Sequence, residues 1–272
     1  VFNRKFRRDA RMRAAQDQID FRVGELKRAI KKQPKEEHAN IMRQANTALS
    51  DPDRAKREAA MNALPAEVAT QVQAMRHEID MMTDQIINSG VVEGKLRVQL
   101  EKNKGWYVHR SYRVFDDPDW AKKVPKEVRN KMKRFLRSEG MTDEEADIKI
   151  QQLLMVGQDS DSPMAMLARG KGGILTDVLK GRKDIPKELR ALWGEYDVAD
   201  VNYTKSMQKM AALHSGFIFT KEVYAAGKGT LFFDKPSEEN IAQFPDDKAK
   251  YGALAGKYTT TEFMNAWTAA HT

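Results

Sequence analysis

The sequence predicts a mostly α-helical protein, with an N-terminal arm built as a helical hairpin or bundle and then an irregular, mainly helical domain with at most one or two short strands. Three observations lead to this prediction. Apolar residues recur at steps of three and four along most of the chain, which is the period of an amphipathic helix. Prolines and glycines separate these stretches, as they do at helix ends. Charged residues make up 32% of the chain, and their number favours extensive solvated helix surface.

Changes in composition divide the chain into three regions. Residues 1–104 are predicted to form a basic, coiled-coil-like helical arm. Residues 105–185 contain an aromatic and basic block, further helices and a glycine-rich loop. Residues 186–272 are predicted to form a C-terminal helical region.

Two apolar stripes define the helices of the arm. The first stripe ends before Pro34, and the second begins after the helix break at Leu64–Pro65. Between them, Ser50 can cap a helix whose first turn contains Pro52. The second stripe steps 4-3-4-3-4, the 3.5-residue period of a coiled-coil seam, but it lasts under three heptads, so a hairpin or bundle is favoured over a long rod. The first stripe consists of Met12, Ala15, Ile19, Val23, Leu26 and Ile30, and the second of Val68, Val72, Met75, Ile79, Met82 and Ile86.

The middle region combines irregular and helical sequence. Residues 107–114 are expected to form a short strand or an ordered extended loop. A basic amphipathic helix is predicted between Pro125 and Gly140. Thr142 and Glu145 then have the spacing of a capping box, in which each side chain bonds the backbone amide of the other residue at the start of a helix.

The C-terminal region is again helical. A helix is predicted to begin at Pro186, with a break near residues 197–200, and residues 230–233 could form one short strand. A last helix is predicted at residues 261–270. The stripe after the break is a further candidate helix interface, formed by Tyr203, Met207, Met210 and Phe217.

The net charge of +8 is concentrated in two segments. Residues 1–32 carry eleven basic and four acidic residues, and residues 122–137 carry eight basic residues and one acid, so each segment has a local charge of +7. Such segments bind polyanions through counterion release, although a solvated helix face explains a single basic run equally well. The candidate polyanion-binding residues are Arg7, Arg8, Arg11, Lys27, Arg28, Lys31, Lys126, Arg129, Lys133 and Arg137.

The sequence carries no recognisable catalytic, cofactor or metal motif. The absence of cysteine excludes disulfides and thiolate sites. The run Arg169–Gly173 lacks the Ser or Thr that follows the lysine of a phosphate-binding loop, and Asp159–Asp161 lacks the later glycine and glutamate of a calcium loop. We therefore expect no catalytic residue, no cofactor and no metal in this chain. No apolar run approaches the roughly 18–20 residues that span a bilayer.

An aromatic and basic block opens the middle region. Tyr107, Arg110, Tyr112 and Arg113 interleave the side chains that stack bases and neutralise phosphates on single-stranded nucleic acids. The alternative is intramolecular, with the tyrosines packed on neighbouring helices and the arginines paired with the acids at 116–117. The second reading is favoured because no RNA-binding or OB-fold pattern surrounds the block.

Three blocks together resemble a region of the very large polyvalent proteins of tailed bacteriophages and related mobile elements. They are Trp106–Pro118 (W-Y-V-H-R-S-Y-R-V-F-D-D-P), Leu189–Met210 (L-R-A-L-W-G-E-Y, then V-N-Y-T-K-S-M-Q-K-M) and Tyr251–Thr261 (Y-G-A-L-A-G-K-Y-T-T-T). In short-tailed phages, such proteins include internal virion or ejection proteins that are delivered with the genome. The resemblance covers about residues 105–265 and contains no catalytic motif.

The resemblance implies a structural, non-enzymatic segment that assembles near the portal, the tail or the packaged DNA. Because the chain starts at Val1, we expect it to be part of a longer protein. Its expected partners are other copies or other virion proteins (portal, tail, other ejection proteins), which the apolar seams would contact. Packaged DNA or an anionic membrane would be bound by the basic faces, and no small-molecule substrate is expected. The expected location is the virion, and after ejection the host envelope or cytoplasm.

Two alternatives remain open at this stage. The chain could be an accessory domain of a virion-carried enzyme, such as a giant RNA polymerase, in which the aromatic and basic block guides single-stranded nucleic acid. It could also be a cytoplasmic nucleic-acid-binding module, which would explain the charge but not the three blocks.

Overall fold

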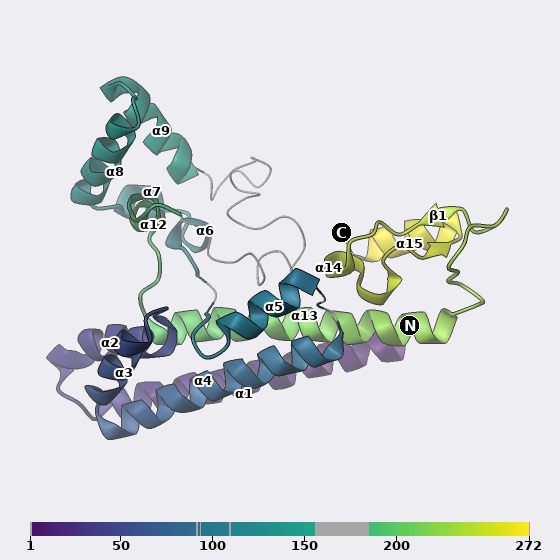
Figure 1. The fold of residues 1–272 in the computed structure, drawn as a ribbon, viewed down its shortest axis with the longest axis horizontal. Coiled ribbons are helices and arrows are strands. Elements are labelled where there is room, and N and C mark those ends of the chain that lie inside the picture. The colour runs from purple at the N-terminus through teal and green to yellow at the C-terminus, as the bar shows by residue number, and fades with distance from the viewer. Residues whose placement is uncertain (1, 91, 93, 109, 156–184, 272) are drawn as a thin grey trace.

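The computed structural model describes residues 2–90, 92, 94–108, 110–155 and 185–271. The predicted fold class is confirmed, because the described chain is mostly helical with one small antiparallel sheet near its C-terminus (Figure 1). The Asp159–Asp161 and Arg169–Gly173 runs and His109 lie outside the described residues.

Three long helices form an elongated bundle that organises the molecule (Figure 1). They are α1 (Phe2–Lys31), α4 (Ala66–Ser89) and α13 (Ala199–Gly227). The two long predicted stripes of the arm lie on α1 and α4, and the C-terminal stripe lies on α13. Helix α1 runs antiparallel to α13, because residue 11 of α1 meets residue 222 and residue 27 meets residue 200.

Shorter helices cover the bundle. Asp53 caps α3 by accepting hydrogen bonds from two backbone amides, whereas Ser50 is the last residue of α2 and donates to the carbonyl of Asn46. The prediction that Ser50 caps this helix was therefore wrong, because its hydroxyl bonds back along the preceding helix. These shorter elements are a 3₁₀ turn (Lys35–Glu37), α2 (His38–Ser50), α3 (Arg54–Asn62) and α5 (Gly94–Asn103).

A second helical unit stands beside the bundle and has its own core. Trp193 packs edge-on against Tyr112, with ring centroids 5.5 Å apart, and its indole N–H donates to the carbonyl of Leu153 at 3.0 Å. The predicted capping box is confirmed, since Glu145 and Thr142 bond each other's backbone amides. This unit contains α6 (Arg113–Asp116), α7 (Trp120–Lys123), α8 (Lys126–Ser138), α9 (Asp143–Met155) and α12 (Lys187–Trp193).

The C-terminal unit packs around buried Phe232 and Phe244. The sheet pairs β1 (Ala242–Gln243) with β2 (Tyr258–Thr259). Residues 230–232 lie in a tight turn in which the carbonyl of Gly227 accepts their amides, so of the predicted strand at 230–233 only Phe233 pairs with β2, in a bridge to Tyr258. The remaining elements are α14 (Lys248–Tyr251), a 3₁₀ turn (Gly252–Leu254) and α15 (Thr261–His271).

The three cores cross the region boundaries drawn from the sequence. Helix α12 belongs to the core of the second unit. The first half of α13 contributes Ala199, Tyr203 and Met207 to the bundle core, whereas Phe219 and Val223 belong to the core of the C-terminal unit. Helix α13 is therefore a spine shared by two cores.

Candidate polyanion interface

Seven of the ten predicted polyanion-binding residues are engaged within the chain. Arg8 pairs with Asp9, Arg28 with Glu25 and Lys27 with Asp200, at 2.5–3.1 Å. Exposed pairs of this kind contribute at most about 1 kcal/mol each, so a phosphate could displace the acid at little cost. The engaged residues are Arg8, Arg11, Lys27, Arg28, Arg129, Lys133 and Arg137.

Helix α9 neutralises part of the basic helix α8. Lys133 lies 2.7 Å from Asp147, and Arg137 lies 2.9 Å from Asp143. The hydrogen bond to Asp147 raises the pKa of Lys133. Arg129 donates to the carbonyl of Ala121 and so ties α8 to α7. The inner face of α8 is therefore committed to the helical hairpin.

Three cations of α8 have no partner among the described residues. Lys126, Lys131 and Arg134 are exposed. Lys131 and Arg134 were not among the predicted residues, although their place in the same basic run could have identified them. Because 3.6 residues make one turn, the three lie within about two turns of one helix. Arg7 and Lys31, on α1, are likewise exposed without a described partner.

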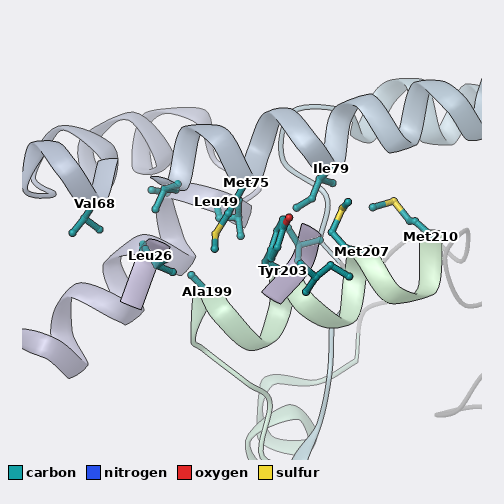
Figure 2. Close-up of a cluster of buried hydrophobic side chains, with 14 of the residues drawn as sticks. Leu26, Leu49, Val68, Met75, Ile79, Ala199, Tyr203, Met207 and Met210 are labelled. Carbon is teal, nitrogen blue, oxygen red and sulfur yellow. The ribbon is translucent and has the colours of Figure 1, made fainter. Parts of the chain in front are cut away.

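The predicted helix-interface residues meet inside a single chain. Eight of them are buried, and Met82 and Phe217 are partly buried against the same core. Figure 2 shows the α4 and α13 side chains pointing toward one another. The apolar seams of α4 and α13 thus cover each other in this structure, and neither is left exposed for a partner protein. The buried members are Val68, Val72, Met75, Ile79, Ile86, Tyr203, Met207 and Met210.

A buried polar network joins the three long helices. Glu78 of α4, only 6% exposed, accepts two hydrogen bonds from Arg22 of α1, at 2.7 and 3.0 Å, and a third from the hydroxyl of Tyr203 on α13. Arg22 also donates to Gln71 at 3.0 Å. Burial, and then the bond to Glu78, raises the pKa of Tyr203, so this residue donates as a neutral phenol. The network was not predicted from the sequence, in which its one signal is a glutamate beside the apolar seam of α4.

The aromatic and basic block is packed against other parts of the chain. Tyr112 is buried, and burial raises its pKa. The guanidinium of Arg113 lies over the ring of Tyr196, 4.7 Å from its centroid, and over Trp120, at 5.6 Å. Arg110 pairs with Glu195 at 3.1 Å. The structure thus has the intramolecular packing that the sequence favoured.

The predicted partners of these arginines were wrong. Asp116 pairs with Lys205 of α13, and Asp117 pairs with Lys123. The reason is topological: the α12–α13 connection brings Glu195 beside the block.

The described residues contain no group of histidine, aspartate and glutamate side chains able to hold a metal ion. None of the described helices is long and apolar enough to cross a bilayer. Comparisons with family models, with curated proteins and with solved structures gave no significant match to the chain.

Proposed function

We propose that this chain is a structural, non-catalytic segment of a phage internal virion or ejection protein. In this proposal it assembles near the portal, tail or packaged DNA, travels with the genome, and contacts a polyanion through its unpaired cations. The setting rests on the resemblance of the three sequence blocks.

The observation that carries the proposal is the packing of the first two blocks against each other. The amide of Arg113 donates to the carbonyl of Gly194, and that of Tyr196 donates to the carbonyl of Ser111, both at 3.0 Å. Lys205 and Asp116 add an ion pair between the same blocks. Two blocks that resemble one family and also pack against each other support a common origin of this chain and that family. Blocks scattered over a surface would support it less.

Three cations of α8 support the polyanion contact. Lys126, Lys131 and Arg134 are exposed and lack described partners, so no internal acid must be displaced when a phosphate binds. Each phosphate neutralised by such a cation releases condensed counterions and makes the affinity fall with salt. We take duplex DNA as the polyanion to be tested.

Mass spectrometry of phage particles before and after triggered DNA release tests the setting. Peptides from residues 1–104 and 105–272 should be present in full particles and lost on release. Peptides that stay with the empty shell would instead indicate a fixed portal or tail component. Their absence from particles would refute the proposal and favour a cytoplasmic nucleic-acid-binding module.

A salt titration of duplex binding tests the three unpaired cations of α8. Replacing them by alanine should reduce the slope of log K against log salt by about 2.7, because each phosphate contact contributes about 0.9. The matched control replaces three exposed cations of the 3₁₀ turn, α2 and α3, Lys35→Ala, Arg43→Ala and Lys56→Ala, for the same loss of charge. Equal effects of the two triple variants would mean that only net charge matters, and the α8 cations would lose their special role.

A further inference from the structure

We propose that residues 4–18, the first half of α1, form a detachable basic arm that leaves α13 to bind a polyanion, and that Glu222 of α13 holds this arm closed. The inference rests on the proposed function for its partner, and it adds a mechanism by which the chain controls access to its cations. The term basic arm is used below for residues 4–18 only.

The basic arm has no buried anchor. Every side chain from Arg4 to Gln18 is exposed or half-exposed. Buried side chains begin at Ile19 and continue with Leu26 and Ile30. Since the burial of a Leu or Ile side chain contributes about 1.5–3 kcal/mol, the second half of α1 is held in the bundle far more firmly than the first.

The basic arm also lacks the third helix of the bundle as a polar partner. The hydrogen bonds and ion pairs to α4 come from Arg22, in the second half of α1, and from Lys32, the residue that follows α1. The basic arm is joined instead to α13. These contacts are the Arg11–Glu222 ion pair, the Gln16–Gln208 hydrogen bond and the guanidinium of Arg8 over the ring of Phe219.

The Arg11–Glu222 contact is poorly satisfied. The pair is 3.4 Å apart, at the long end of a hydrogen bond. The Nε and Nη2 atoms of Arg11 and the Oε2 atom of Glu222 are buried, and each has no hydrogen-bond partner among the described residues. The contact therefore holds the arm only weakly, because both groups gain hydrogen bonds to water or to phosphate when the arm moves away.

The charge of the basic arm indicates its partner. It carries six cations and two acids, Asp9 and Asp17. A phosphate backbone can accept bidentate hydrogen bonds from a guanidinium, which the single long contact to Glu222 does not provide. Glu222 therefore competes with phosphate for Arg11, and neutralising it should favour the open form. The cations are Arg4, Lys5, Arg7, Arg8, Arg11 and Arg13.

Hydrogen exchange on the wild-type chain tests the opening. We compare the amides of residues 8–18 with those of residues 20–30, so that the first turn, which lacks intrahelical acceptors, is left out. The amides of residues 8–18 should exchange at least about tenfold faster, and adding duplex DNA should change their exchange selectively. Equal protection of the two halves would overturn the proposal.

The Glu222→Gln variant tests the latch. Its matched control is Glu25→Gln, which removes the same charge from a side chain of nearly equal exposure, 27% against 29%, that pairs with Arg28 in the firmly held half of α1. We expect Glu222→Gln to raise duplex affinity several-fold more than Glu25→Gln and to accelerate exchange at residues 8–18 alone. Equal effects of the two variants would refute the latch.

The outcomes also separate this inference from the proposed function. Binding that depends on the α8 cations while DNA leaves exchange at residues 8–18 unchanged would overturn the arm and leave the proposed function standing. If no variant bound duplex DNA, the polyanion contact would be overturned both in the proposed function and in this inference.

Discussion

The buried network around Glu78 gives the sharpest prediction about what holds the bundle together. Replacing Glu78 by leucine leaves the hydroxyl of Tyr203 without its acceptor and removes the carboxylate that Arg22 binds. Breaking a buried ion pair by removing one partner costs about 3–5 kcal/mol. Because Arg22 is 20% exposed and keeps its bond to Gln71, we expect a loss of free energy of unfolding near the lower end, about 3 kcal/mol.

A double-mutant cycle with Tyr203→Phe isolates the bond between the two side chains. A hydrogen bond to a charged group contributes about 1.5–3 kcal/mol, so Tyr203→Phe should cost that amount. The double variant should lose at least about 1 kcal/mol less free energy of unfolding than the sum of the single variants. The reason is that it contains neither the Tyr203 hydroxyl without its acceptor nor the Glu78 carboxylate without its donor. The assay is urea unfolding followed by circular dichroism, with unchanged m values as the sign that only stability differs.

The control for this cycle is Glu67→Leu, on the same helix. Glu67 pairs with Lys32 at 2.7 Å, but both side chains are exposed, so the loss should stay below about 1 kcal/mol. If Glu78→Leu cost no more than Glu67→Leu, or if the cycle were additive, the network would not be what joins the three helices, and the reasoning would fail.

The same network has a signature at alkaline pH. The pKa of Tyr203 is raised in the folded state, so its contribution is fully present below the ordinary tyrosine pKa of about 10. Above that pH the unfolded chain ionises while the folded chain does not, and stability declines. Tyr203→Phe should therefore show a smaller loss of stability above about pH 10 than the wild type.

Two further predictions concern a glycine and a histidine. Gly194 has a positive φ of 69°, and a Cβ there would lie 2.3 Å from the ring of Trp120. Gly194→Ala should therefore lower the free energy of unfolding, measured by thermal unfolding, by more than about 2 kcal/mol. The control is Gly229→Ala, with φ 77° and no atom within 4 Å of the added Cβ, which should lower it by only about 1–2 kcal/mol. Equal losses would contradict the steric argument. Burial, and then the charge of Arg11, lowers the pKa of His214, so below the ordinary value of about 6.5 the unfolded chain binds a proton that the folded chain does not. Stability should therefore fall as the pH drops through about 6.5, and less so in His214→Gln. An identical fall in both proteins would exclude His214 as the cause.

Local signals predicted the helix boundaries well, because they act through the backbone of neighbouring residues. Pro65, Pro125 and Pro186 each precede the first residue of a helix, as expected for a residue that fixes φ and has no N–H to donate. The capping box at Thr142 was found for the same reason. One or two short strands were predicted, but the position of the sheet was not, because its two-residue strands pair across a gap of about fifteen residues and carry no alternating pattern.

The candidate site was less predictable, because charge pairing depends on tertiary register. The basic run of α8 has only one acid within it, but the fold places Asp143 and Asp147 of α9 against its inner face. The same limitation hid Glu195 as the partner of Arg110. A sequence gives the sign and spacing of charges along one helix, whereas the cations left for a ligand are decided by the helix packed against it.

Phe219 connects the basic arm to the C-terminal unit. One contact of its ring is the guanidinium of Arg8, 5.3 Å from the centroid, and another is the stacked indole of Trp267, at 6.0 Å. Phe219 is 4% exposed and belongs to the core that Trp267 helps to cover. Since α13 carries both Phe219 and Glu222, the surface against which the arm closes is also the surface on which the C-terminal unit is built. Release of the arm would remove a cation from the ring of Phe219, so we expect the C-terminal unit to respond to the same polyanion as the arm.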